Sequence, residues 1–277
     1  MHHPVLLKEV IEGLNIKPNG LYIDATAGEG GHMVEIAKRG GKVLGIDCDY
    51  EQIKRLTLNV QRYKNIRIVQ GNFAYIEKIA KENNFFLVDG ILFDLGLSMN
   101  QLENSRRGFS YKKMDEPLDM RIDTTLSATA SNVVNELDQQ VLYEILSRYG
   151  EEINSLIISK EIVKRRQKKK IQTVVDLITT INKALGYKKN ETHARIFQAL
   201  RIAVNDELEN LKKGLDGSLK ILKNGGRIVV ISFHSLEDRI VKQFIRNKKL
   251  RQINKKIIIS INQFTFERSA KLRIIGY

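Results

Sequence analysis

The stretch LYIDATAGEGGH, residues 21–32, decides the fold of this chain. Residues 21–27 have the apolar character of a buried strand, with Asp24 at its end. A turn with three glycines follows: Gly28, Gly30 and Gly31. Residues 32–39 are then expected to form a helix. A strand, a glycine turn and a helix bring bare backbone and the free N–H groups of a helix N-terminus close to a ligand, so this stretch predicts a nucleotide-type binding site.

The chemistry of the ligand follows from the acids around this turn. The next predicted strand, residues 42–47, ends in Asp47, which lies 19 residues beyond Gly28. This is close to the ~20-residue spacing at which a carboxylate binds ribose hydroxyls. A nicotinamide fingerprint requires a third glycine where this chain has Met33. Asp24 before the glycines suits a cationic ligand, so we expect S-adenosylmethionine, which has a sulfonium and no phosphate. The alternative is a tight turn that binds no ligand.

Length and composition limit the possible classes of protein. The 277 residues, 42% of them hydrophobic, are enough for one large α/β domain or for such a domain with an insertion. No apolar run reaches the ~18 residues of a membrane span, and the N-terminus does not resemble a signal peptide. Cys48 is the single cysteine, which excludes an internal disulfide. We therefore expect a cytoplasmic protein with no membrane contact.

The charge balance points to a nucleic-acid partner. The chain has 46 Lys and Arg against 32 Asp and Glu, a net charge of +14. A basic protein without a membrane anchor most often binds nucleic acid, although a lysine-rich composition can also reflect an AT-rich genome. The five histidines are scattered, and none pairs with a carboxylate at metal-ligand spacing, so we predict no structural metal.

Strand and helix patterns alternate along the first third of the chain, which predicts an α/β fold with a doubly wound parallel sheet. The expected helices are residues 5–14, 51–61 and 73–82, and the further expected strands are 66–71, 88–96 and 226–233. Residues 104–202 show helical periodicity and no convincing strand. We therefore expect an inserted helical domain there, flanked by residues 1–103 and 203–277 of the main domain. One long helix is predicted over residues 194–215, and an antiparallel edge hairpin over residues 255–277.

In an open parallel sheet the ligand lies beyond the carboxyl ends of the strands. This geometry gathers Asp24, Asp47, Phe73 and Asp94 around one crevice. Phe73 follows the third strand, where an aromatic ring can stack on adenine. The alternatives are that Asp24 and Asp47 are helix N-caps and that Phe73 is a core residue.

Asp94 is the strongest candidate for a catalytic residue. Methyl transfer from a sulfonium is an in-line displacement, so the enzyme mainly holds the acceptor on the methyl axis. If the acceptor is an exocyclic amine, the carboxylate of Asp94 and the carbonyl of Leu95 can accept its N–H groups and later take the proton. Gly96 would let the backbone approach a flat base. The alternative is that Asp94 caps a loop or contacts only the cofactor.

The chain resembles the bacterial ribosomal RNA small-subunit methyltransferase H family, also called MraW, over essentially its whole length. The motifs that carry the resemblance stand in this order: HHPVLLKEV, IDATAGEGGH, LGIDCD, GNF, ILFDLGLSMNQL, RRGFSY, PLDMRID, YGEE, RIFQALRIAVNDEL, ISFHSLEDRIVKQF and RSAKLR. Several such motifs in one order are highly specific to this family.

The resemblance implies a class I methyltransferase fold with an inserted helical domain for substrate recognition. It implies methylation of N4 of a cytidine in the decoding centre of 16S ribosomal RNA, with S-adenosyl-L-methionine as cofactor. By motif position, it implies cofactor contacts from seven residues: Gly30, Gly31, His32, Asp47, Phe73, Asp94 and Gln101. The family usually has Ser and Pro where this chain has Met99 and Asn100. The segment before RSAKLR is also shorter than usual.

Contacts with RNA are predicted from basic stretches. KEIVKRRQKKK, residues 160–170, lies in the insertion, and a second run covers residues 242–256. Phosphate contacts there would make affinity depend on salt; the alternative is a solvated helix face. In RRGFSY, Arg107 and Phe109 are candidates to hold a splayed base, unless this segment is only a structured loop.

PLDMRID is expected to form an internal ion pair, and His234 in ISFHSLEDR is expected either to act as a base or to cap the next helix. The rival to a methyltransferase is a ribosome-assembly factor that binds rRNA and uses the cofactor only as a structural ligand. An intact Asp94 and Gln101 argue against it.

Overall fold

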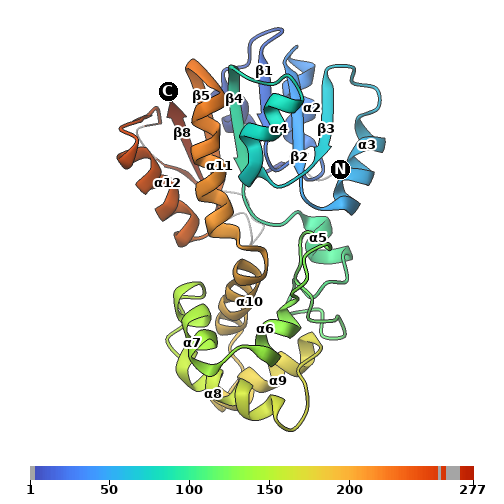
Figure 1. Ribbon diagram of the computed structural model, residues 1–277, viewed down its shortest axis with the longest axis vertical. Helices are drawn as coiled ribbons and strands as arrows, with labels where there is room; N and C mark the ends of the chain where they lie inside the picture. The colour runs from blue at the N-terminus through green and yellow to red at the C-terminus, as the bar shows by residue number, and fades with distance from the viewer. Residues whose placement is uncertain (1–3, 255–256, 260–268) are drawn as a thin grey trace. The chain divides into compact units, whose positions relative to one another are not determined.

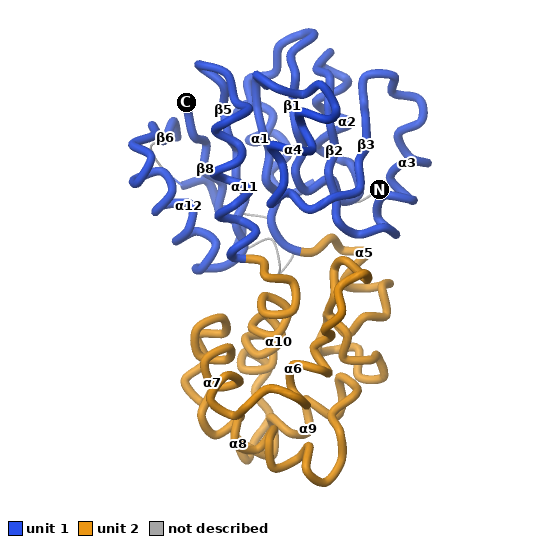
Figure 2. The backbone as a smooth tube through the Cα atoms, in the orientation of Figure 1, with its two compact units in different colours: residues 1–96, 208–277 blue, residues 97–207 orange. Residues whose placement is uncertain are grey.

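The computed structural model describes residues 4–254, 257–259 and 269–277. The chain divides into two compact units (Figures 1 and 2). Unit 1 comprises residues 1–96 and 208–277, and unit 2 comprises residues 97–207, where the sequence suggested an insertion over 104–202. Among the described residues, no helix is both long and apolar enough to cross a membrane.

The described residues of unit 1 form one eight-stranded sheet with the order β3-β2-β1-β4-β5-β8-β6, in which β7 also pairs with β8. The first five strands are parallel neighbours: β1 Leu21–Asp24, β2 Lys42–Asp47, β3 Ile66–Gln70, β4 Val88–Asp94 and β5 Leu222–Ser232. Antiparallel pairing joins the last three: β6 Arg251–Gln252, β7 Ile258–Ile259 and β8 Lys271–Gly276. The sheet is therefore mixed, with its parallel part as predicted.

The predicted edge hairpin was only partly right. β7 and β8 do pair in antiparallel fashion, but β8 also pairs with β5 along its whole length and so lies inside the sheet. The side chains of residues 272–275 in β8 are buried. This burial is expected for a strand that lies inside a sheet covered on both faces. Residues 255–256 and 260–268 of the predicted hairpin lie outside the described residues.

Helices cover both faces of this sheet (Figure 1). One face packs against α1 Leu7–Leu14, α2 Gly31–Lys38 and α3 Tyr50–Val60. The other packs against α4 Ile76–Glu82, α11 Glu207–Ile221 and α12 Ser235–Asn247, with the short 3-10 helix η1 Phe73–Tyr75 preceding α4. Successive side chains of a strand point to opposite faces of the sheet. In β4, Ile91 and Phe93 pack in the core on the α4 side, and Leu92 packs in the core on the α1 side. The result is the predicted doubly wound α/β architecture.

Unit 2 is helical and has a hydrophobic core of its own. Its helices are α5 Met99–Asn104, α6 Ala130–Glu136, α7 Gln139–Arg148, α8 Ser155–Arg166, α9 Val174–Leu185 and α10 Asn190–Asn205. Its residues, all of which are described, form no strand, and an isolated antiparallel bridge joins Pro117 and Thr173.

The predicted single helix over residues 194–215 was wrong. The structure divides it into α10 and α11 at Asp206, whose φ of 48° is left-handed. The side chain of Asn205 explains where the break falls. Its Oδ1 accepts the N–H of Ile122 at 2.7 Å, and its Nδ2 donates to the carbonyl of Met120 at 2.8 Å. These contacts come from a distant segment, so helical periodicity alone could not indicate the break.

Candidate functional site

Three predicted acids lie at the carboxyl ends of three neighbouring strands. Asp24 ends β1, Asp47 ends β2 and Asp94 ends β4, and β1 lies between the other two in the sheet. All three strands are parallel, so their last residues meet at one edge. The sheet therefore places these acids together as the sequence predicted.

Asp24 is almost fully buried, with 1% of its surface exposed. Its Oδ1 accepts the N–H of Thr26 at 3.2 Å. Burial raises the pKa of Asp24 from 3.8 to about 7; His32 and the N–H of Thr26 oppose this rise, while Asp94 and Asp47 add to it. A buried carboxylate with this pKa is a group that a cationic ligand would stabilise in its ionised form.

Asp47 holds the glycine turn. Its Oδ2 accepts the N–H of Gly28 at 2.8 Å and its Oδ1 accepts the N–H of Asp49 at 2.9 Å. Burial raises the pKa of Asp47 from 3.8 to about 6, against the lowering effect of these two N–H groups. A carboxylate has about four lone-pair positions, so these bonds leave acceptor capacity for ligand hydroxyls.

The alternative that Asp24 and Asp47 are helix N-caps was wrong. The N-cap of α2 is Gly30, which has no side chain to contribute, and the N-cap of α3 is Asp49, whose Oδ1 accepts the N–H of Glu51 at 3.1 Å. Gly28 and Gly30 have φ values of 48° and 84°, which a glycine adopts readily. These two glycines are thus required by the turn itself, whatever it binds.

His32 lies in the first turn of α2, and its Nε2 is 3.4 Å from Oδ2 of Asp94. His32 is 5% exposed. Within the described part of the chain, neither of its ring nitrogens has a hydrogen-bond partner, and the buried Oδ1 of Asp94 has none either. These unsatisfied polar atoms are unusual in a folded protein, and they mark the position where a ligand group is needed.

A hydrogen bond of its backbone N–H fixes the position of Asp94. Its N–H donates to Oγ1 of Thr26 at 2.7 Å, across β4 and β1. Leu95 continues the pairing through its N–H, which donates to the carbonyl of Ile231 at 3.0 Å. Gly96 has a φ of 100°, so the turn after β4 needs a glycine. Sequence reasoning missed Thr26; its place two residues after Asp24 in IDATA was the available signal.

Phe73 is half-buried at the start of η1, after β3. Its ring meets that of Phe93 edge-on, with 5.6 Å between centroids, and it packs against the core on the α4 side of the sheet. Phe73 therefore does pack against the core, as one of the two interpretations predicted. Stacking of Phe73 on adenine stays a prediction.

Gln101 belongs to unit 2, where it completes a capping box at the start of α5. Its Oε1 accepts the N–H of Ser98 at 2.9 Å, and Oγ of Ser98 accepts the N–H of Gln101 at 3.2 Å. Met99 and Asn100, which depart from the family pattern, occupy the first turn of this helix. A cofactor contact from Gln101 stays a prediction.

Arg107 and Phe109 have structural partners inside unit 2. Nη1 of Arg107 donates to the carbonyls of Arg121 and Ile122 at 3.0 and 2.8 Å, and its guanidinium lies 5.2 Å from the ring centroid of Phe109. Phe109 is 6% exposed and packs in the core of the unit. A role for either residue in holding a base stays a prediction, and it would need the ring of Phe109 to become accessible.

PLDMRID forms the expected internal ion pair. Nε and Nη2 of Arg121 donate to the two carboxylate oxygens of Asp119 at 2.7 and 2.8 Å, and this bidentate contact holds the pKa of Asp119 below its usual value. Met120 between them is fully buried.

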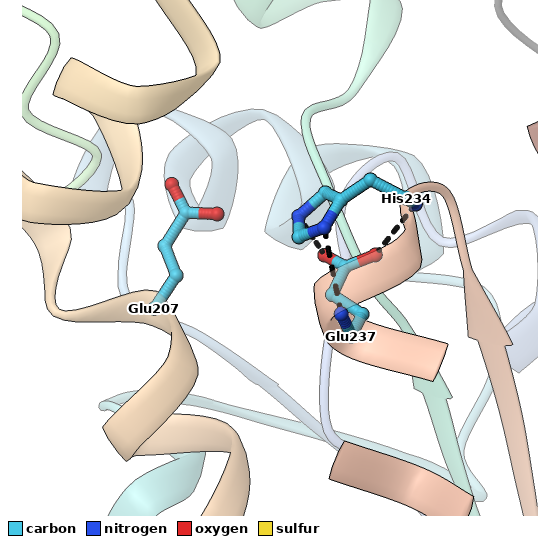
Figure 3. Close-up of side chains that lie close together, drawn as sticks. All are labelled: Glu207, His234 and Glu237. Atoms are coloured by element: carbon cyan, nitrogen blue, oxygen red, sulfur yellow. Dashed lines mark hydrogen bonds and ion pairs between the residues drawn. The ribbon is translucent and has the colours of Figure 1, made fainter. Parts of the chain in front are cut away.

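His234 is the N-cap of α12, one of its two predicted roles. Its Nδ1 accepts the N–H of Glu237 at 3.4 Å (Figure 3). Oε2 of Glu237 accepts the N–H of Phe233 at 2.7 Å. Nε2 of His234 lies 3.2 Å from Oε1 of Glu237. Glu207, also drawn in Figure 3, belongs to unit 2, where its carboxylate accepts two N–H groups of Arg201.

The basic stretch 160–170 is only partly structural. Arg166 donates to the carbonyls of Val134 and Leu137 at the end of α6, and Arg165 and Lys169 pair with Asp176 at 3.7 and 3.6 Å. Four exposed lysines have no carboxylate within 4.0 Å among the described residues: Lys160, Lys164, Lys168 and Lys170. Two of them lie in α8 and two just beyond its end. These four lysines, called the α8 lysines below, are the part of the stretch that is free to bind an anion.

The residues at the strand ends fit the predicted cofactor. A ligand with positive charge, ribose hydroxyls and no phosphate matches a site that offers a buried carboxylate at Asp24 and a half-buried one at Asp47. At Asp94 the site adds a carboxylate oxygen that has no hydrogen-bond partner among the described residues. The glycine turn beside them brings backbone, rather than cationic side chains, to the same edge of the sheet.

The family model and the curated relatives that match this chain indicate the same family. A model of the MraW methylase family matches residues 1–276. The ribosomal RNA small subunit methyltransferase H of Halothermothrix orenii is 48% identical over 252 residues, which cover 88% of this chain and 81% of the relative. That of Coprothermobacter proteolyticus is 42% identical over 285 residues, which cover 99% and 95%. Among solved structures, an rRNA methylase from Streptococcus thermophilus matches with a TM-score of 0.47 and 10% identity, covering 100% of this chain and 98% of that one.

Proposed function

Because this chain belongs to the MraW methylase family, we propose that it methylates N4 of a cytidine in the decoding centre of 16S ribosomal RNA. The family match confirms S-adenosyl-L-methionine as the predicted cofactor. The relatives are named as small-subunit rRNA methyltransferases, and their high coverage of this chain supports the same substrate class here. We infer that the protein acts in the cytoplasm, where the small ribosomal subunit is found.

The proposed chemistry rests on one observation, which is the unsatisfied carboxylate oxygen of Asp94. Its carboxylate lies at the end of β4, and its buried Oδ1 has no hydrogen-bond partner among the described residues. Leaving a buried acceptor unsatisfied costs about 1–3 kcal/mol. An exocyclic amine, which offers two N–H donors, would remove this cost when it binds. The amine of the proposed cytidine would therefore supply the hydrogen-bond donor that Oδ1 of Asp94 lacks among the described residues.

The cofactor supplies a methyl group on a positively charged sulfur. Asp94 accepts an N–H of the cytosine amine, which localises the nitrogen lone pair that is otherwise delocalised into the ring. As the N–C bond forms and the S–C bond breaks, the nitrogen loses one proton, and Asp94 takes it. The bond from Thr26 to the backbone of Asp94 fixes the start of this turn and so helps to hold the acceptor on the methyl axis.

We propose that seven residues contact the cofactor: Gly30, Gly31, His32, Asp47, Phe73, Asp94 and Gln101. Asp47 would accept ribose hydroxyls with the lone pairs that Gly28 and Asp49 leave free. Asp24, which the family pattern did not indicate, is a further candidate to face the positive charge, because it is buried and lies beside Asp47 and Asp94 at the same edge.

We propose unit 2 as the part that recognises RNA. The α8 lysines support this role, because they are exposed and no carboxylate of the described residues lies within 4.0 Å of them. Lysines of this kind bind phosphates and release counterions. The net charge of +14 agrees with an anionic macromolecule as substrate rather than a small amine.

The decisive experiment uses small ribosomal subunits from a strain that lacks this methylation. The subunits are incubated with the protein and with S-adenosylmethionine carrying a labelled methyl group, and the digested nucleosides are identified by mass. We expect labelled N4-methylcytidine. Label on another atom would change the acceptor, and absence of label despite measurable cofactor binding would favour the assembly-factor function. Mature subunits, precursor subunits and naked 16S rRNA, tested in parallel, would identify the form of the substrate.

A further inference from the structure

His32 and Asp94 form a contact that a cofactor-binding role for His32 does not explain. The imidazole Nε2 lies 3.4 Å from Oδ2 of Asp94, and the two residues come from α2 and from the end of β4. Both belong to unit 1. The distance is slightly longer than an ordinary hydrogen bond, and catalytic hydrogen bonds often shorten only when ligands bind.

The burial of His32 makes this contact important. Its side chain is 6% exposed, against 22% for that of Asp94. A buried polar group without a hydrogen bond is costly, and among the described residues no atom accepts or donates a hydrogen bond at either ring nitrogen. The carboxylate of Asp94 is the polar group that Nε2 faces. An apolar side chain could fill this position without the free-energy cost of burying an unpaired polar group. An interaction with the carboxylate of Asp94 is therefore the best explanation for an imidazole here.

We propose that His32 is a positioning residue for Asp94. Its Nε2–H holds Oδ2 of the carboxylate, so that Oδ1 is left to accept an N–H of the substrate amine. The proposal rests on the proposed function, in which Asp94 receives the amine proton. It goes beyond a cofactor contact, because it assigns His32 an effect on the transfer step itself.

The arrangement of Asp94 shows why its carboxylate needs such a partner. Thr26 fixes the backbone N–H of Asp94, but no described residue donates a hydrogen bond to the buried Oδ1. The carboxyl group can therefore rotate unless Oδ2 is held. A displacement of about 1 Å in a reacting geometry can cost about 100-fold in rate. His32 also acts electrostatically on Asp24, where it opposes the rise in pKa that burial causes.

A double-mutant cycle separates positioning from cofactor binding. The proteins are the wild type, His32→Ala, Asp94→Asn and the double variant, with His32→Gln as a variant that keeps an N–H donor. Rates are measured at saturating cofactor and RNA, and KM for the cofactor is measured separately. We expect kcat of His32→Ala to fall by about 10- to 100-fold, partial recovery in His32→Gln, and no further loss when His32→Ala is added to Asp94→Asn.

Each other outcome overturns a defined part of the proposal. A higher KM with kcat unchanged would make His32 a cofactor contact only. Losses that multiply in the double variant would mean that His32 acts independently of Asp94. Full activity of Asp94→Asn would refute the catalytic role in the proposed function instead, whatever His32 does.

A control for general damage is available in unit 2. His193 is also buried, with Nε2 2.7 Å from Oδ1 of Asn182. His193→Gln should show the same fractional change of kcat in wild-type and Asp94→Asn backgrounds. Thermal unfolding of every variant shows whether it folds. If His32→Ala does not fold, the comparison of His32→Gln with His32→Leu in both backgrounds replaces it, and equal kcat for these two would refute positioning.

Discussion

The carboxylate of Asp47 accepts the N–H of Gly28, with 2.8 Å between Oδ2 and N. This bond joins the end of β2 to the glycine turn that follows β1, and a second bond from the N–H of Asp49 occupies Oδ1. An acid that the sequence indicated as a ribose ligand therefore also holds the loop in which the cofactor is expected to lie. In the proposed function, ligand binding and loop stability are therefore coupled through this one side chain.

Replacement of Asp47 should weaken both properties. In Asp47→Ala two backbone N–H groups lose their acceptor, and each unsatisfied buried donor costs about 1–3 kcal/mol. We expect a lower free energy of unfolding and cofactor affinity reduced by at least about tenfold. Asp47→Asn keeps one oxygen acceptor and should be milder in both. Urea unfolding and calorimetric titration measure the two effects, and unchanged stability of Asp47→Ala would contradict the role in the turn.

The stability of the cofactor-free protein should depend on the ionisation of Asp24 and Asp47. Burial raises their pKa values from 3.8 to about 7 and about 6, so the folded state favours the protonated forms. Their contribution to stability is complete below the unfolded pKa and is lost as pH rises through about 6 to 7. Asp24→Asn should therefore gain stability relative to wild type at pH 8 and lose that advantage at pH 4. An equal difference at both pH values would contradict the raised pKa.

Cofactor affinity should show the opposite trend with pH. A cationic ligand favours the ionised form of Asp24, so binding at low pH requires loss of its proton. We expect affinity for S-adenosylmethionine to fall by up to about tenfold per pH unit below about 7. In Asp24→Asn this dependence should flatten, leaving a weaker one from Asp47. Titrations between pH 5.5 and 8.5 test this, and a profile identical to wild type would exclude Asp24 as the group responsible.

The α8 lysines should contribute to RNA affinity through phosphates. Each phosphate contact contributes about 0.7 to 0.9 to the slope of log affinity against log salt. Replacing all four lysines by Gln should reduce that slope by up to about 3, with no change in cofactor affinity. A matched control replaces four exposed lysines of unit 1: Lys8, Lys54, Lys64 and Lys213. Equal effects of the two sets would indicate a general charge effect rather than a binding surface.

His234 should prove to be a helix cap rather than a base. Asn is a good N-cap, so His234→Asn should keep kcat within about threefold of wild type, whereas His234→Ala should lose about 1 kcal/mol of stability. The structure supports this through the capping box with Glu237. A loss of kcat by 100-fold or more in a folded His234→Asn protein would restore the role of a base.

The break between α10 and α11 gives a stability prediction within unit 2. Asn205→Ala leaves the N–H of Ile122 and the carbonyls of Met120 and Arg201 without this partner. We expect the free energy of unfolding to fall by about 2–4 kcal/mol. Asp206→Gly should be neutral or stabilising, because its φ of 48° suits glycine. A destabilised Asp206→Gly would show that the Asp side chain, and not the backbone, matters there.

The sequence by itself determined the alternating architecture and the place of the acids at the strand ends. β2 has the predicted bounds, residues 42–47, and the parallel strands of unit 1 follow the predicted order along the chain. Apolar strands, amphipathic helices and glycine turns are local patterns, and their physical causes act over a few residues. The acids at the ends of β1, β2 and β4 could therefore be located before any tertiary contact was known.

Tertiary structure alone decided the contacts and the pKa values of these acids. The bond between Thr26 and Asp94 joins residues 68 positions apart, and Asn205 reaches Ile122 across 83 positions. Burial sets the pKa of Asp24, and the approach of α2 to the end of β4 sets the distance from His32 to Asp94. Burial and through-space distance arise only when distant segments pack together, so local sequence carries no direct sign of them.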